Sequence, residues 1–310
     1  MVAQTRNWLA TEAVVDPIHI DGREYKLLLQ PTKWAREPSA ALANAFWTKR
    51  LRPIIQRRLD KPPSGKARFQ GQFDPVKIRH VRYWDTKSHA LASHELTLRQ
   101  RGKASDTDGR QEITLKLRTS DLFISALTAV TGSQRDAEKK LEEDISPLQV
   151  QLSSAGRGRK VVTDYSATRS RFSRSTTQSI GSDALPSTLA QACKLFPSLE
   201  DNLMSRHERG LTLKTRLAPG RLIEEHVFKG PKVDLGSRIS GEFALTFWFF
   251  EKQRRVPQVS EISFKCDLDG GLMPLSVARR AHRLFVAMQE ELADWANMQD
   301  SSKTELALPR

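Results

Sequence analysis

Two stretches decide the fold: Glu95-Leu96-Thr97-Leu98-Arg99-Gln100-Arg101 and Glu112-Ile113-Thr114-Leu115-Lys116-Leu117-Arg118. In both, aliphatic residues alternate with polar or charged ones, which is the period of two that is typical of a half-buried β-strand. The turn-rich residues 102–110 between them predict an antiparallel hairpin. One face of this hairpin is apolar, and the other carries the cations Arg99, Arg101, Lys116 and Arg118.

The sequence on either side of this hairpin contains further patterns that predict strands and helices. Strands are predicted over residues 211–217, 222–229, 243–250 and 259–266. Helices are predicted over residues 38–59 with a break near Pro53, over 122–130, 134–145 and 185–203, and after Pro274. Because the strands come in two blocks, each followed by helices, the sequence predicts an α+β fold with a mainly antiparallel sheet.

Composition and charge indicate which kinds of partner and which cellular setting to expect for this protein. The 310 residues include 50 Lys and Arg against 36 Asp and Glu, a formal net charge of +14, and 38% are hydrophobic. This basic excess predicts an anionic partner or a solvated basic surface. No run approaches the ~18 consecutive apolar residues of a membrane helix, so we expect a cytoplasmic protein without a membrane partner. The two cysteines, Cys193 and Cys266, exclude a disulfide scaffold.

The chain is expected to form a single domain over residues 1–300. Within it, residues 38–66 are predicted to be a basic helical insertion. Residues 153–182 are rich in Ser and Arg, a composition that predicts a flexible segment. The tail, residues 301–310, is expected to be frayed.

Cations also occupy alternate positions outside the hairpin, at Lys214 and Arg216, and another lies near the end of the last strand, at Lys265. On an open sheet these side chains would form a solvated face. If the sheet closes into a barrel, the same face points inward, where only a polyanion such as triphosphate can neutralise it.

A family resemblance favours the barrel. The stretch Tyr83-Trp84-Asp85-Thr86, the Arg-x-Arg of residues 96–101 and Thr114-Leu115-Lys116 together resemble the core signature of the CYTH, or triphosphate tunnel, superfamily. Residues 195–197 and 261–265 are more loosely similar to the second half of that family. The resemblance implies a closed antiparallel barrel whose cations hold a triphosphate and whose glutamates hold Mg²⁺ or Mn²⁺.

The chain departs from this family in its acids. In the first strand, Glu24-Tyr25-Lys26-Leu27-Leu28, the second acid is replaced by Lys26, and in the last strand Glu261 is followed by Ser263. Glu24 and Glu261 are therefore the expected metal ligands. Glu142 and Asp144 are weaker candidates, because residues 134–145 are more typical of a solvated helix. Such an incomplete acid set predicts slow or absent metal-dependent hydrolysis.

The predicted function is binding of a triphosphate-containing or polyphosphate ligand inside a basic barrel, with slow hydrolysis as a second expectation. The alternative is a non-catalytic basic protein that binds nucleic acid or another polyanion. Its basis is the charge of residues 49–66 and 157–174, without a recognised nucleic-acid-binding motif. The sequence leaves catalysis and the oligomeric state open.

Overall fold

The computed structural model describes residues 17–34, 38–59, 69–103, 109–154, 157–204, 211–250, 256–297 and 303–309. Its principal strands are β1 Gly22–Leu29, β3 Lys77–Asp85, β4 Leu96–Lys103, β5 Arg110–Thr119, β6 Glu138–Ser154, β7 Arg157–Gly181, β9 Ile223–Gly236, β10 Ile239–Phe250 and β11 Val259–Asp267. The short strands β2 Phe69–Gln70 and β8 Ala218–Pro219 pair at its edges.

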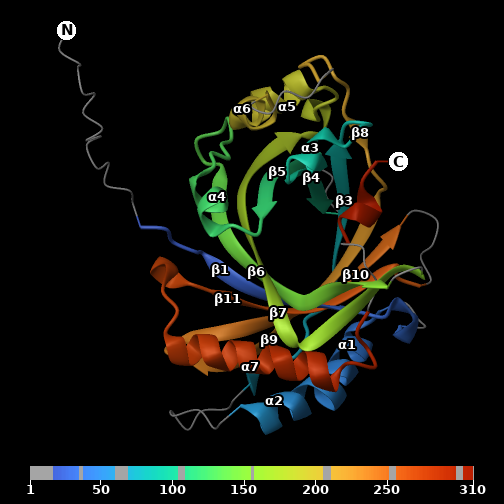
Figure 1. The fold of residues 1–310 in the computed structure, drawn as a ribbon, viewed down its shortest axis with the longest axis vertical. Helices are drawn as coiled ribbons and strands as arrows, with labels where there is room; N and C mark the ends of the chain where they lie inside the picture. Colours follow the sequence, from blue (N-terminus) through green and yellow to red (C-terminus); the bar gives the residue numbers. More distant parts are fainter. Residues whose placement is uncertain are drawn as a thin grey trace, which may run out of the picture.

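These strands close into a barrel (Figure 1). The hydrogen-bonded order is β9-β10-β11-β1-β6-β7-β5-β4-β3, and β3 pairs back with β9. The pairing of β1 with β6 is parallel, whereas the other pairings in this ring are antiparallel. The predicted α+β fold with a mainly antiparallel barrel is therefore confirmed.

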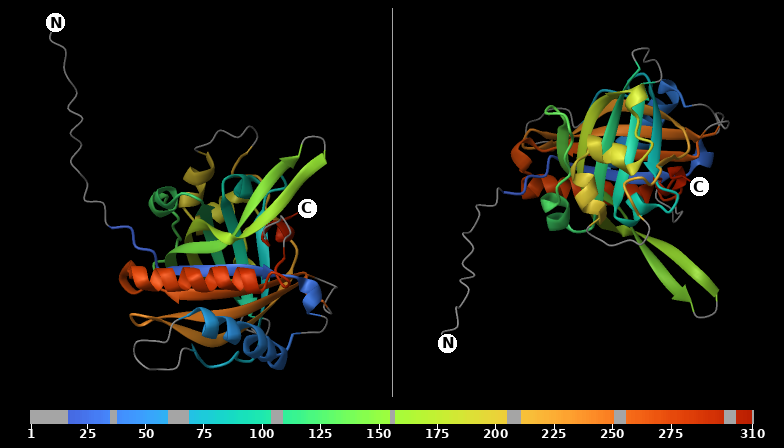
Figure 2. Two further views of the ribbon diagram at one scale, coloured as in Figure 1. Left: turned by 60° about the horizontal axis from the view of Figure 1, so that its bottom comes forward. Right: turned by 90° about the horizontal axis from the view of Figure 1, so that it is seen from above.

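Helices cover two sides of the barrel from outside (Figures 1 and 2). They are α1 Ala40–Phe46, α2 Arg52–Arg58, α3 Ala90–Ser93, α4 Leu122–Leu127, α5 Leu189–Leu195, α6 Ser198–Met204 and α7 Leu275–Glu291. One apolar core joins α1, α2 and α7 to the outer faces of β1, β9, β10 and β11. A second core joins α5 and α6 to the outer faces of β4 and β5. Among the described residues, none of these helices is long and apolar enough to cross a membrane.

Strand alternation separates this outer core from the side chains that face the barrel interior. On β1, Tyr25, Leu27 and Leu29 are buried against the helical layer, and the Tyr25 ring lies 5.4 Å from that of Phe285 on α7. Because successive side chains point to opposite faces of a strand, Glu24 and Lys26 face the barrel interior.

The predicted helix over residues 134–145 is wrong, since residues 138–145 belong to β6 and residues 134–137 form a turn before it. Its residues are good helix formers and carry charges at helical spacing, which is why the sequence favoured a helix. Tertiary pairing overrides that preference, because β6 is hydrogen-bonded to β1 on one side and β7 on the other. The helix predicted over 122–130 is present as the shorter α4.

The Ser/Arg-rich segment 153–182 also differs from expectation. Residues 157–181 form β7, which pairs with β5 and β6. Figure 2 shows the β6–β7 hairpin extending past the barrel wall. The flexible segment was predicted from composition, which carries no information about the two strands that this segment pairs with. Residues 155–156 lie outside the described residues.

Two further expectations are corrected near the C-terminal half. Residues 211–217 form a loop instead of a strand, and the carbonyls of Leu213 and Thr215 accept hydrogen bonds from the first turn of α5. The tail predicted to fray is packed where it is described, since Ala307 is fully buried and Leu308 is 9% exposed. Of the predicted basic insertion 38–66, residues 40–58 are helical, with a π-helical turn at Trp47–Leu51, and residues 60–66 lie outside the described residues.

Candidate anion-binding site inside the barrel

The β4–β5 hairpin places its charged face toward the barrel interior. Leu96 and Leu98 are buried under α5 and α6, so the alternate residues Arg99 and Arg101 point inward. Strand register sets Thr97 opposite Lys116 and Arg99 opposite Thr114, which brings Lys116 and Arg118 to the same face. All four hairpin cations thus lie where the sequence predicts, and their role as ligands stays a prediction.

Asp144 on β6 is the centre of the first interior ion-pair group. Its carboxylate is 2.6 Å from the Lys26 ammonium and also pairs with the Arg118 guanidinium. Lys26 in turn lies 2.9 Å from Glu24. Burial opposes ionisation of Asp144, but Lys26 and Arg118 outweigh it and hold the pKa of this carboxyl well below its ordinary value. Asp144 is therefore a fixed anion at neutral pH.

Glu142, two residues earlier on the same face, forms a second group. One carboxylate oxygen lies 2.8 Å from the Lys265 ammonium and the other lies 3.8 Å from that of Lys116. Burial again opposes the charge, but Lys116 and Lys265 lower the pKa of Glu142. Lys265, expected as a phosphate ligand, is thus already shared with this acid and with Asp267 at 3.2 Å.

Glu225 on β9 is an interior acid that the sequence analysis did not single out. Its carboxylate accepts a 3.0 Å hydrogen bond from the Trp248 indole and lies 3.7 Å from Arg101 and 4.0 Å from Arg79. Burial disfavours its charge, but the neighbouring cations, Arg101 first, lower its pKa. A signal existed, because residues 222–229 were predicted as a strand and an acid on it could face inward.

Glu261 on β11 pairs with Lys303, which lies in the C-terminal segment. The Lys303 ammonium lies 2.5 Å from the Glu261 carboxylate and 5.3 Å from the centre of the Trp248 ring. The sequence holds no signal for this contact, because the tail was expected to be frayed.

Arg99 and Lys116 are the interior cations with least compensation. Among the described residues, the Arg99 guanidinium has no carboxylate within 4.0 Å, and its Nε–H has no partner. It donates a long hydrogen bond to Thr114 at 3.5 Å. Burial, followed by the nearby Arg101, lowers its pKa. Burial likewise lowers the pKa of Lys116 to about 7, and the opposing effect of Asp144 is offset by Arg118 and Lys26. Arg99 is therefore a buried cation without a carboxylate partner among the described residues, whereas Lys116, despite Glu142 at 3.8 Å, holds its proton only weakly near pH 7.

Lys214 and Arg216 do not join this set. Both side chains are exposed, in the loop that precedes β8. They were expected to face inward because residues 211–217 read as a strand, and without that strand the alternation argument does not apply.

One side of the interior is apolar and filled. Its side chains come from β3, β9, β10 and β11 and from the C-terminal segment: Val81, Tyr83, Ile223, Trp248, Phe250, Val259, Ala307 and Leu308. The C-terminal segment is therefore part of the barrel filling, and the apolar cluster borders the polar groups, because Trp248 donates a hydrogen bond to Glu225 and its ring lies 5.3 Å from the Lys303 ammonium.

The four acids proposed to hold Mg²⁺ or Mn²⁺ all face the interior, and the acid set is larger than the sequence indicates because β9 adds Glu225. Each of these carboxylates, however, is paired with at least one lysine or arginine: Glu24, Glu142, Asp144, Glu225 and Glu261. In the part of the chain that the structure describes, no three acid, histidine or cysteine side chains are grouped to hold a metal ion. The arrangement does not fit a divalent cation.

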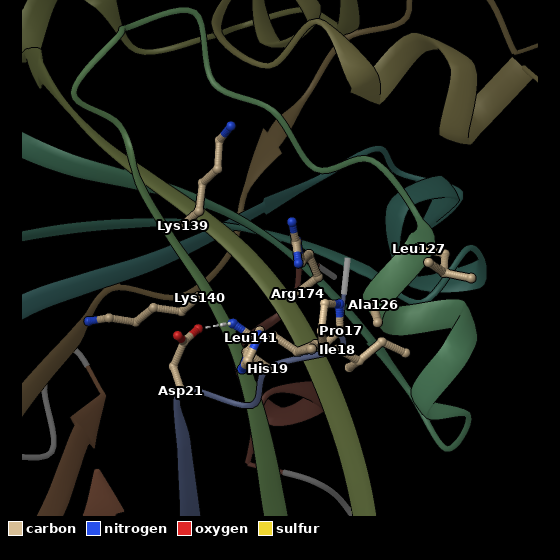
Figure 3. A pocket seen from close by; sticks show the side chains of 10 residues that line it. All are labelled: Pro17, Ile18, His19, Asp21, Ala126, Leu127, Lys139, Lys140, Leu141 and Arg174. Atoms are coloured by element: carbon tan, nitrogen blue, oxygen red, sulfur yellow. Dashed lines mark hydrogen bonds between the residues drawn. The ribbon is translucent and has the colours of Figure 1, made fainter. Parts of the chain in front are cut away.

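A surface pocket of about 390 Å³ lies elsewhere, beside α4 (Figure 3). Ile18, Leu127, Lys139 and Arg174 are among the residues that line it, and Asp21 there accepts a hydrogen bond from the Leu141 backbone at 2.6 Å. It shares none of the predicted ligand residues, so it is separate from the interior site.

Comparisons with known proteins give distant structural similarities. A Hippeastrum protein, described as an adenylyl cyclase candidate with a dominant triphosphatase activity, is 13% identical with a TM-score of 0.41, over 91% of this chain and 93% of its own. A candidate adenylate cyclase from Bacillus halodurans is 13% identical (TM-score 0.36; 92% of this chain, 98% of its own). One from Vibrio parahaemolyticus is 9% identical (TM-score 0.30; 93% and 98%). No protein-family model and no curated protein matches the sequence.

The closed barrel is the architecture that the resemblance to the triphosphate tunnel superfamily predicts, and that prediction is confirmed.

Proposed function

We propose that the protein binds a triphosphate or a short polyphosphate inside the barrel. The observation that supports this most is the pair Arg99 and Lys116, two interior cations on neighbouring strands that acids of the chain leave undercompensated. A buried cation without an anion costs several kcal/mol, and an anionic ligand removes that cost.

The spacing of the cations favours an extended anion. Neighbouring strands lie ~4.8 Å apart, and alternate residues of one strand lie ~7 Å apart. Arg99 and Arg101 on β4 and Lys116 and Arg118 on β5 therefore form a row that several linked phosphates can contact at once. A single phosphate would contact fewer of these side chains. Arginine can also hold two phosphate oxygens through two parallel hydrogen bonds, which strengthens the interaction.

Calorimetric titration with tripolyphosphate and with orthophosphate tests this proposal. At physiological salt we expect tripolyphosphate to bind at least about tenfold more tightly, a difference of about 1.4 kcal/mol. Arg99→Ala should weaken tripolyphosphate binding by about tenfold or more. Arg216→Ala, which removes one exposed arginine outside the barrel, is the matched control and should change the affinity by less than about twofold.

Equal weak binding of both anions, or equal losses in the two variants, would contradict an interior site. The nucleic-acid alternative predicts a different result, namely sub-micromolar binding of short RNA or DNA that Arg99→Ala does not affect. Part of the basic helical surface is already compensated, because Arg57 and Arg58 on α2 pair with Glu291 on α7. Hydrolysis with Mg²⁺ or Mn²⁺ stays a prediction from the sequence, because the paired carboxylates give it no further support.

A further inference from the structure

We infer that two lysines, Lys26 and Lys303, take the place of a divalent cation in the barrel interior, so that the polyphosphate binds without a metal ion. This inference rests on the proposed function and concerns what neutralises the interior acids.

Lys26 occupies a bridging position between two carboxylates. Strand register sets Glu24 on β1 beside Asp144 on β6, and the Lys26 ammonium lies 2.9 Å from the first carboxylate and 2.6 Å from the second. Bridging two carboxylates from different strands is what Mg²⁺ or Ca²⁺ does with oxygen ligands. Here a covalently attached ammonium group does it instead. A metal ion could reach these oxygens only if Lys26 moved away.

Lys303 of the C-terminal segment pairs with a single interior carboxylate, that of Glu261. Its ammonium lies 2.5 Å from the carboxylate, and its side chain is 24% exposed. The segment that carries it is anchored, since Ala307 and Leu308 are buried and the Arg221 amide donates to the Ala307 carbonyl. The chain also passes close to Gly220, where a Cβ atom would lie 2.0 Å from that carbonyl oxygen. The segment that carries Lys303 is therefore anchored a few residues further along the chain, at Ala307 and Leu308.

The charge balance supports the same conclusion. Glu24 and Asp144 are matched by Lys26 and Arg118, and Glu261 is matched by Lys303. A divalent cation added to these neutralised acids would bring two positive charges into an interior where Arg99 and Lys116 are already undercompensated. A polyanion would bring the opposite charge, so the interior favours the anion without the metal.

Titration of tripolyphosphate in EDTA and in millimolar Mg²⁺ tests the inference. We expect the affinity in EDTA to equal or exceed that in Mg²⁺, because Mg²⁺ complexes the free ligand and reduces its charge. Binding that needs Mg²⁺, or that Mg²⁺ tightens by tenfold or more, would overturn the inference while leaving the proposed function intact. Failure to bind in either condition would instead contradict the proposed function.

Metal binding by the protein alone gives an independent readout. Lys26→Met and Lys303→Met each remove a charge and keep most of the side-chain length, which frees the Glu24 and Asp144 carboxylates or that of Glu261. Titration of Mn²⁺, with free Mn²⁺ followed by electron paramagnetic resonance, should show at least tenfold tighter binding in one or both variants than in the wild type. Lys214→Met, an exposed lysine in a loop, is the matched control and should behave as the wild type.

Equal Mn²⁺ affinity in the wild type and in both folded variants would contradict the inference. The two lysines lie on different elements, a barrel strand and the C-terminal segment, so loss of folding in one variant leaves the other as a test.

Discussion

Lys116 shows how a single residue can link ligand binding to pH. Burial lowers the pKa of its ammonium to about 7 from an ordinary 10.5, with Asp144 and Glu142 opposing the shift and Arg118 and Lys26 adding to it. Between these two values the unfolded chain keeps the proton and the folded chain releases it. The contribution of Lys116 to the free energy of unfolding therefore rises with pH across this range. A bound polyanion favours the charged form, so binding above pH 7 should take up a proton.

We predict that the affinity for tripolyphosphate falls as the pH is raised from about 7 to 9, and that Lys116→Arg reduces this fall. Arginine stays charged throughout this range. The titration of tripolyphosphate itself is common to both proteins, so the difference between their pH profiles reports Lys116. Calorimetry over a series of pH values provides the measurement, and superimposable profiles would show that Lys116 does not titrate at the ligand.

At the scale of an element, β6 is a strand with two different electrostatic faces. Asp144 faces the interior and pairs with Lys26 and Arg118, whereas the adjacent Glu143 faces outward and pairs with Arg23 at 2.5 Å. Removing the charge of Asp144 would leave two cations in the interior without their main partner. The same change at Glu143 would affect a pair outside the barrel interior.

We predict that Asp144→Asn lowers the free energy of unfolding by about 3 kcal/mol, because it breaks a buried ion-pair group. The same substitution should tighten tripolyphosphate binding, since Lys26 and Arg118 become available to the ligand. Glu143→Gln is the matched control on the same strand, with no gain in affinity expected. Urea unfolding and calorimetry measure the two effects. A loss of affinity in Asp144→Asn equal to its loss of stability would argue that Asp144 merely supports the fold.

The strand β6 is an element whose secondary structure could not be predicted from the sequence, whereas several other elements could. The β4–β5 hairpin and the helix after Pro274 were predictable because one face of each is apolar and the other polar. The strand within 243–250 was predictable because it is dense in aromatic residues. In β6 both faces carry charge, with Glu142 and Asp144 toward the interior and Glu143 on the outward face, so its pattern resembled that of a solvated helix. The prediction for β7 was wrong because it rested on a serine-rich composition, which does not show that this segment pairs with β5 and β6.

The sequence predicts the hairpin cations of the candidate site, but it predicts only some of the acids. Arg99, Arg101, Lys116 and Arg118 follow from alternation on two adjacent strands. Glu225 and Lys303 come together through contacts between distant elements, which alternation within one strand cannot reveal. Lys303 in particular depends on the packing of Ala307 and Leu308, which places a terminal segment inside the barrel.

In the molecule as a whole, closure of the barrel turns the charged face of the sheet inward, and this enclosure makes it a candidate anion-binding site. Pairing of β3 with β9 encloses the charged face, and the apolar side chains on one side of the interior exclude water from part of it. Electrostatic interactions strengthen where water is excluded. The same cations on an open sheet would be solvated and would bind anions weakly and with strong dependence on salt.

A crystal structure of the protein grown with tripolyphosphate and EDTA would show directly whether polyphosphate binds inside the closed barrel. We predict phosphate oxygens within hydrogen-bonding distance of the Arg99 guanidinium and the Lys116 ammonium, with Lys26 and Lys303 still paired to their carboxylates. Tripolyphosphate bound only on the outer surface, such as at the pocket beside α4 with Lys139 and Arg174, would contradict binding inside the barrel.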